Sequence, residues 1–176
     1  MGRIIAYSGS HGTGKTTAAY ELAAQLKKQT RADVGIILEV ARRCPLSVFR
    51  KGHAPTEAAQ IWIFSEQMRL EIEALQRHDL VVADRTVVDA IAYSAAAGFH
   101  DLARAQIATA RRHVHVYDKV YFRGAADNPF LVDDGFRETD PDLQKTVESL
   151  MLELYSELGI GVIRDYADGA RQAGHR

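Results

Sequence analysis

Residues near the start of the chain have the types and spacing needed to hold phosphate. The segment Gly9–Thr16 reads G-S-H-G-T-G-K-T and matches G-x-x-x-x-G-K-[ST] at every fixed position. Its glycines let the backbone curl so that successive N–H groups point at phosphate oxygens, and the positive end of a following helix adds to the attraction. Lys15 would supply charge to the β- and γ-phosphates, and the Thr16 hydroxyl would ligate magnesium.

This loop predicts that the chain binds a nucleoside triphosphate, ATP with Mg²⁺. We expect the nucleotide to contact the following residues: Gly9, His11, Gly12, Thr13, Gly14, Lys15, Thr16 and Thr17. A glycine-rich turn with no ligand is the alternative reading, but all four fixed positions match in a strand-to-helix context, which disfavours it.

Charged residues follow two later apolar runs. Asp84 comes directly after Leu80–Ala83 and is followed by Arg85, and Glu39 lies near the end of Val34–Val40. A carboxylate at such a position can complete the shell of a magnesium ion or accept a proton from an attacking hydroxyl. Asp84 is therefore a candidate for both roles, and Glu39 is the competing candidate for the general base.

Short apolar runs alternate along the chain with amphipathic helical patterns, which is typical of an α/β fold. Because the runs are apolar throughout, they indicate parallel strands covered on both faces. We expect a three-layer α/β/α sandwich around a five-stranded parallel sheet, with ligands at the carboxyl ends of the strands. The expected strands are Ile4–Ser8, Val34–Val40, Leu80–Ala83, Lys119–Phe122 and Ile160–Arg164. The expected helices are Lys15–Lys28, two helical patterns within Glu57–Arg77, about 89–97, about 102–112, and Asp142–Leu158.

Composition limits the remaining classes of protein. The chain has 176 residues, 47% of them hydrophobic, and a net charge of −1, which favours one domain over residues 1–176 and argues against an obligatory nucleic-acid partner. The single cysteine, Cys44, excludes an internal disulfide and favours a reducing compartment. With no apolar run long enough for a signal peptide or a membrane span, we expect a cytoplasmic protein without a membrane partner.

A family resemblance rests on the order of several motifs. The sequence E-V-A-R at Glu39–Arg42 and the sequence D-G-F-R at Asp134–Arg137 accompany the phosphate loop and Asp84. This set resembles the kinase domain of bacterial nicotinamide riboside kinases and the related small P-loop proteins labelled AAA-type ATPases. The resemblance extends from about Ile4 to about Tyr166.

The resemblance implies roles for individual residues. It makes Glu39 a ligand of the acceptor, Arg42 a contact on the acceptor side, and Arg137 an arginine of a mobile lid over about 123–141. The pair Asp84-Arg85 resembles the pair in small nucleoside and nucleotide kinases, where the arginine steadies the substrate or the transferring phosphate. Gln67, like Gln60, lies on a helix where members of the family place substrate-facing polar groups, although a surface position is an equal alternative. Arg85-Thr86 departs from the riboside kinases, which favour threonine directly after the aspartate, and so favours the wider kinase group.

Three functions remain open at this point. The leading one is a kinase that transfers the γ-phosphoryl group of ATP to a small nucleoside-like or nucleotide acceptor, with catalysis by Lys15, Glu39, Asp84, Arg85 and Arg137. The second is a polynucleotide kinase that acts on a hydroxyl of DNA or RNA, including a hydroxymethylated base. The third is a P-loop ATPase that transfers nothing to an acceptor.

Overall fold

A computed structural model describes residues 2–49, 53–126 and 140–165. Its strands form one five-stranded sheet in the order β2-β3-β1-β4-β5, and every neighbouring pair is parallel. The strands are β1 Arg3–Ser8, β2 Val34–Ile37, β3 Leu80–Asp84, β4 Tyr117–Phe122 and β5 Val162–Arg164. The helices are α1 Lys15–Gln29, α2 Glu57–Arg77, α3 Val87–Ala96, α4 His100–Ala110 and α5 Pro141–Glu157, with short 3₁₀ turns η1 Val40–Arg43 and η2 Val114–Val116.

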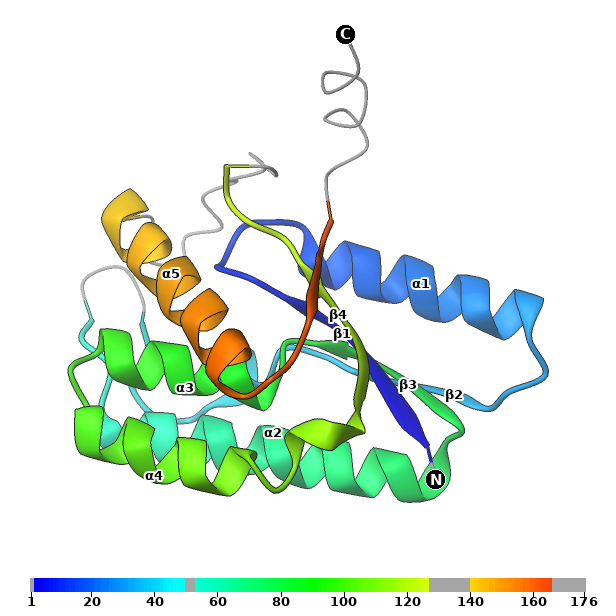
Figure 1. Cartoon of the computed structure of the whole chain (residues 1–176), viewed down its shortest axis with the longest axis horizontal. Coiled ribbons are helices and arrows are strands. Elements are labelled where there is room, and N and C mark those ends of the chain that lie inside the picture. The colour runs from blue at the N-terminus through cyan, green and yellow to red at the C-terminus, as the bar shows by residue number, and fades with distance from the viewer. Residues whose placement is uncertain (1, 50–52, 127–139, 166–176) are drawn as a thin grey trace, which may run out of the picture.

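Helices cover both faces of the sheet, as Figure 1 shows. On one face, α1 packs Ala18 and Ala19 against Tyr7, Val34 and Val82. On the other face, α2 packs Leu75 against Ile4 and Ala6, while α3 and α5 cover β4 around Phe122 and Met151. The layers confirm the predicted α/β sandwich with its parallel sheet. None of the helices in the described ranges is long and apolar enough to cross a membrane.

The register of the sheet gathers the predicted site residues at one edge. Tyr7 in β1 lies opposite Asp84 in β3, and Ser8 lies opposite Phe122 in β4. Because parallel strands all end on the same side, the segments that follow β1, β2, β3 and β4 converge there. The phosphate loop, Glu39, Arg85 and Arg123 each lie in one of these segments.

The structure corrects two expected elements. The apolar run Val34–Val40 was expected to be one strand, but β2 ends at Ile37 and Val40 begins η1. The two helical patterns within Glu57–Arg77 form one continuous helix, α2, whose first turn is capped by the Thr56 hydroxyl accepting from the N–H of Ala59. The other predicted elements begin and end within a few residues of the observed ones.

Candidate active site

The phosphate loop connects β1 to α1 and requires its glycines. Gly9 has a φ of +133°, and Gly12 and Gly14 each have a φ of +73°, a region that side chains disfavour. Gly14 is also the residue that directly precedes the first residue of α1, Lys15, so the N-terminus of that helix faces the loop. The predicted strand–loop–helix context is therefore present, with the N-terminal N–H groups of α1 available to an anion.

Lys15 is buried within this loop. Its Nζ donates to the carbonyl oxygen of Ser10 and to the Thr13 hydroxyl, the latter over 3.1 Å. Burial lowers the pKa of the Lys15 ammonium to about 7, assisted by the positive charge of Arg85 and opposed by Asp84 and Glu39. An anion bound at the loop would favour the charged form of this lysine, since an opposite charge within a few ångströms stabilises it.

Thr16 and Asp84 form the candidate magnesium site. The Thr16 hydroxyl donates to Asp84 Oδ2 over 2.5 Å, and burial raises the pKa of the Asp84 carboxyl, against the lowering effect of Lys15 and Arg85. Mg²⁺ prefers hard oxygen ligands and is held in phosphate sites by one or two protein groups together with substrate phosphates. A hydroxyl beside a carboxylate, next to the phosphate loop, fits that ion.

Arg85 has an unusual backbone conformation, and its side chain contacts the phosphate loop. Its φ is +90°, in the region that favours glycine, and such strain in a non-glycine residue is concentrated at functional sites. Its Nε donates to Glu39 Oε1 over 3.1 Å, and its Nη1 donates to the carbonyl oxygen of Gly9 over 3.2 Å. Arg42 Nε donates to the other oxygen of Glu39 over 2.9 Å. The structure thus brings Glu39, Arg42 and Arg85 together beside the loop.

Asp89 and Gln67 fix the geometry of Arg85. Asp89 Oδ1 accepts from the N–H of Gly9 over 3.3 Å and from Arg85 Nη1 over 3.4 Å. Gln67 Nε2 donates to the main-chain carbonyl of Arg85 over 3.2 Å. Sequence reasoning did not select Asp89, although Thr86-Val87-Val88-Asp89 has the spacing of a capping box, and both of its hydrogen bonds form at the start of α3.

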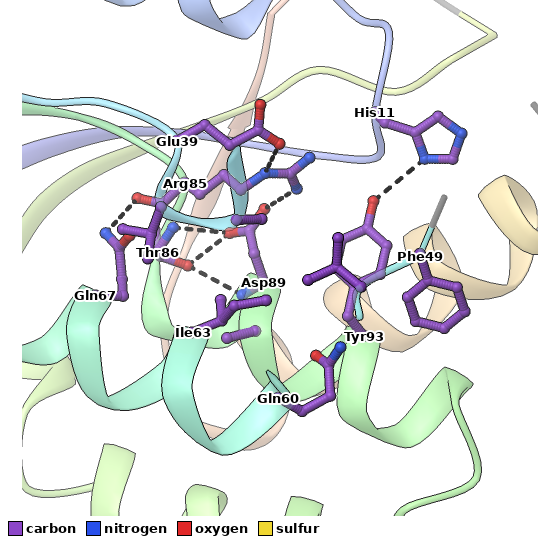
Figure 2. Close-up of a pocket in the computed structure, with 14 residues that line it drawn as sticks. His11, Glu39, Phe49, Gln60, Ile63, Gln67, Arg85, Thr86, Asp89 and Tyr93 are labelled. Atoms are coloured by element: carbon purple, nitrogen blue, oxygen red, sulfur yellow. Dashed lines mark hydrogen bonds and ion pairs between the residues drawn. The ribbon is translucent and has the colours of Figure 1, made fainter. Parts of the chain in front are cut away.

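Glu39 lies between two pockets. The first, which we call the phosphate pocket, has a volume of about 430 Å³ and is lined by residues 12–17, Glu39, Arg42 and Asp84. The other, which we call the second pocket, is also lined by Glu39, together with Arg85, and is shown in Figure 2. Its lining includes His11, Phe49, Gln60, Gln67, Asp89 and Tyr93. Arg42 was expected on the acceptor side, and the structure places it in the lining of the phosphate pocket.

The second pocket combines aromatic walls with buried polar groups. The rings of Phe49 and Tyr93 lie 5.7 Å apart, and the Tyr93 hydroxyl is 3.3 Å from His11 Nδ1, so the His11 ring faces this pocket although its backbone belongs to the loop. Gln60 and Gln67 are 1% and 3% exposed, which rules out the surface alternative for both. Arg137, and most of the predicted lid, lie outside the described residues.

Comparisons with known proteins bear on the family and the fold. A family model described as an AAA domain matches residues 4–172. A search of curated proteins gave no match. Thymidylate kinase from Ehrlichia chaffeensis has a similar structure, with a TM-score of 0.62 and 18% identity over 98% of this chain and 94% of that one. Deoxyadenosine kinase from M. mycoides, with the products dCMP and a flexible dCDP bound, has a TM-score of 0.60 and 15% identity over 94% and 90% of the two chains. Since the family model covers most of the sequence, the protein belongs to this family of P-loop AAA domains.

Proposed function

We propose that the protein is an ATP- and magnesium-dependent kinase that transfers the γ-phosphoryl group to a small nucleoside-like or nucleotide acceptor. The observation that supports this most is the position of Glu39, which lines both the phosphate pocket and the second pocket. Direct transfer between two substrates requires two adjoining sites, and a carboxylate at their boundary can take the proton of a hydroxyl acceptor. An ATPase that only hydrolyses its nucleotide needs no second organic site.

The charges of the site suit phosphoryl transfer. Lys15 and the loop N–H groups would bind the β- and γ-phosphates, and Arg85 would stabilise the negative charge that spreads over the transferring group. Thr16 and Asp84 would hold Mg²⁺, which supplies charge to the phosphate oxygens. With a hydroxyl acceptor, Glu39 would take the hydroxyl proton as the acceptor oxygen bonds to the γ-phosphorus and the bond to the β-phosphate oxygen breaks, leaving ADP. The phosphate of a nucleotide acceptor is already largely ionised near pH 7 and would need no base.

The lining of the second pocket favours a planar acceptor of small size. Phe49 and Tyr93 offer aromatic faces, and Gln60 offers an amide in a buried setting. Apolar walls with a few placed polar groups are typical of small-molecule sites, whereas polymer sites use open basic grooves. Both similar kinases carry nucleoside or nucleotide names in keeping with this class.

A panel of nucleosides and nucleoside monophosphates, offered with Mg-ATP, tests the proposal. We expect ADP to form quickly with one chemical class of acceptor and slowly without any. Omission of magnesium should abolish the acceptor-dependent rate. Formation of ADP at one rate regardless of the acceptor would overturn the kinase assignment in favour of an ATPase. Activity confined to oligonucleotides, with a steep dependence on salt, would overturn the small acceptor in favour of a polymer.

A further inference from the structure

Arg123, the first residue after β4, contacts both ends of the phosphate loop. At the start of the loop, its N–H donates to the carbonyl oxygen of Ser8 over 2.9 Å. Its own carbonyl oxygen lies against Gly9, where an added Cβ would be only 2.1 Å away. The main chain of Arg123 therefore packs so closely on Gly9 that no side chain fits at this position.

The side chain of Arg123 reaches the other end of the loop. Its Nη1 donates to the carbonyl oxygens of Thr13 and Gly14 over 3.4 and 3.2 Å. Its Nε donates to Asp165 Oδ2, just after β5, over 2.7 Å, and its guanidinium lies 5.9 Å from the centre of the Tyr7 ring. The side chains of Arg123 and Asp165 are 14% and 13% exposed, so the pair is largely shielded from water.

These contacts control the direction of two N–H groups. In a planar trans peptide, the carbonyl of one residue and the N–H of the next point in opposite directions. A hydrogen bond to the Thr13 carbonyl therefore orients the Gly14 N–H. The Gly14 carbonyl accepts from Arg123 and also from the N–H of Ala18 over 3.1 Å, so Arg123 and the first turn of α1 together orient the Lys15 N–H. Both carbonyls are drawn towards Arg123, so both N–H groups are turned the other way. In a phosphate loop such N–H groups bind the phosphate oxygens.

We propose that Arg123 is a positioning residue for the triphosphate, which it affects by orienting the Gly14 and Lys15 peptides without touching the nucleotide. The inference rests on the proposed ATP site and assigns a role to a residue outside the loop. Arginine suits this role because its planar fork donates to Asp165 and to the loop carbonyls at once. A lysine at the same position keeps the charge but cannot span these partners with one ammonium group.

The test measures binding, not turnover. We would titrate Mg-ATP and inorganic tripolyphosphate with Mg²⁺ into the wild type, Arg123→Lys, Asp165→Asn and the control Arg111→Lys by calorimetry. The control alters an exposed arginine that is also paired with a carboxylate, Glu157, away from the loop. We expect Arg123→Lys to weaken both ligands by about tenfold or more, as for the loss of hydrogen bonds from a charged donor. Asp165→Asn should weaken both by less, and Arg111→Lys should match the wild type.

The readouts separate positioning from stability. Molecules that have unfolded irreversibly lower the stoichiometry and leave the Kd unchanged, whereas reversible unfolding raises the apparent Kd only when the folded fraction is small. Circular dichroism at the titration temperature therefore checks that each variant is fully folded. Unchanged Kd values for Arg123→Lys would therefore overturn the inference. So would weaker binding of ATP with unchanged binding of tripolyphosphate, because Arg123 would then contact the nucleoside part. A wild type that binds neither ligand would overturn the proposed function together with this inference.

Discussion

Buried charges of both signs are the main feature of the site at the scale of residues. Lys15 and Arg85 are 4% and 8% exposed, and the carboxylates of Glu39, Asp84 and Asp89 lie at 8% or less. Isolated charges are costly to bury, so each group requires its partners. Counted as ionised, two cations and three carboxylates give these groups a formal charge of −1. Under the proposed function, a bound triphosphate would add further negative charge, which a divalent cation can offset.

Lys15→Ala should remove ATP-dependent activity while the fold survives. The lysine would supply charge to the phosphates, and its ammonium donates to Ser10 and Thr13 of the loop rather than to a residue of another element. We expect kcat/KM to fall by ~10²-fold or more, measured as ADP formation, with a circular dichroism spectrum like that of the wild type. Lys27→Ala, at an exposed position in the last turn of α1, is the matched control. Full turnover in the Lys15 variant would remove the loop from the mechanism.

Gly9→Ala should destabilise the protein strongly. At a φ of +133° any side chain is strained, and here the new methyl would also meet the Arg123 carbonyl. We expect a loss of at least about 2 kcal/mol in the free energy of unfolding, measured by urea denaturation. Gly161→Ala serves as the control, since an added Cβ there meets no atom within 4 Å. Equal free energies of unfolding for the two variants would contradict the close packing of the Arg123 carbonyl on Gly9.

At the scale of elements, apolar runs and helical periodicity predicted the fold class and most boundaries. The strand predicted over Val34–Val40 failed near its end, where Glu39 bonds to Arg42 and Arg85 instead of continuing an apolar run. An apolar run indicates burial but not the direction in which the chain turns. The run therefore predicted Val40 as part of the strand, although Val40 begins η1. Lys15 and Thr16 were predicted because the spacing of their motif is local, and Asp84 because it follows an apolar run directly.

The residues that the sequence did not predict as part of the site contact partners that are, in most cases, far away in the sequence. Asp89 joins Gly9 to Arg85, Phe49 meets Tyr93, and Arg123 bonds to Asp165. Such pairs depend on the order of strands in the sheet and on its register, which a single sequence does not display. Only the capping-box spacing before Asp89 offered a local signal.

Helix α2 carries a buried acid whose removal should be costly. Glu71 is fully buried and accepts from Gln67 Nε2 over 2.8 Å and from the Tyr117 hydroxyl over 2.8 Å, and it lies 2.7 Å from His113 Nε2. Glu71→Ala leaves these groups without their partner, so we expect a loss of about 3 kcal/mol in unfolding free energy. Glu73→Ala, at a half-exposed position on the same helix, should cost under about 1 kcal/mol. Guanidinium denaturation compares the two, and similar losses would contradict a structural role specific to Glu71.

At the scale of the whole molecule, two pockets lie at the carboxyl ends of the strands, and Glu39 lines both of them. Glu39→Gln keeps the shape of the side chain and removes its charge, so it separates the functions of the pockets. We expect the Kd for Mg-ATP to stay within about threefold of the wild type, while transfer to a hydroxyl acceptor falls by ~10²-fold or more if Glu39 is the base. Calorimetry gives the first quantity and a rapid-quench assay gives the second. Loss of ATP binding would instead place Glu39 in the magnesium site and make Asp84 the better candidate for the base.

The central claim is that the γ-phosphoryl group moves from ATP to a small acceptor. The most direct measurement follows one turnover of Mg-ATP labelled in its γ-phosphoryl group, with the best acceptor from the panel, and quantifies every labelled product by mass spectrometry. The account predicts one phosphorylated acceptor for each ADP formed and almost no labelled inorganic phosphate. Release of the label as inorganic phosphate, at the same rate with and without the acceptor, would contradict it.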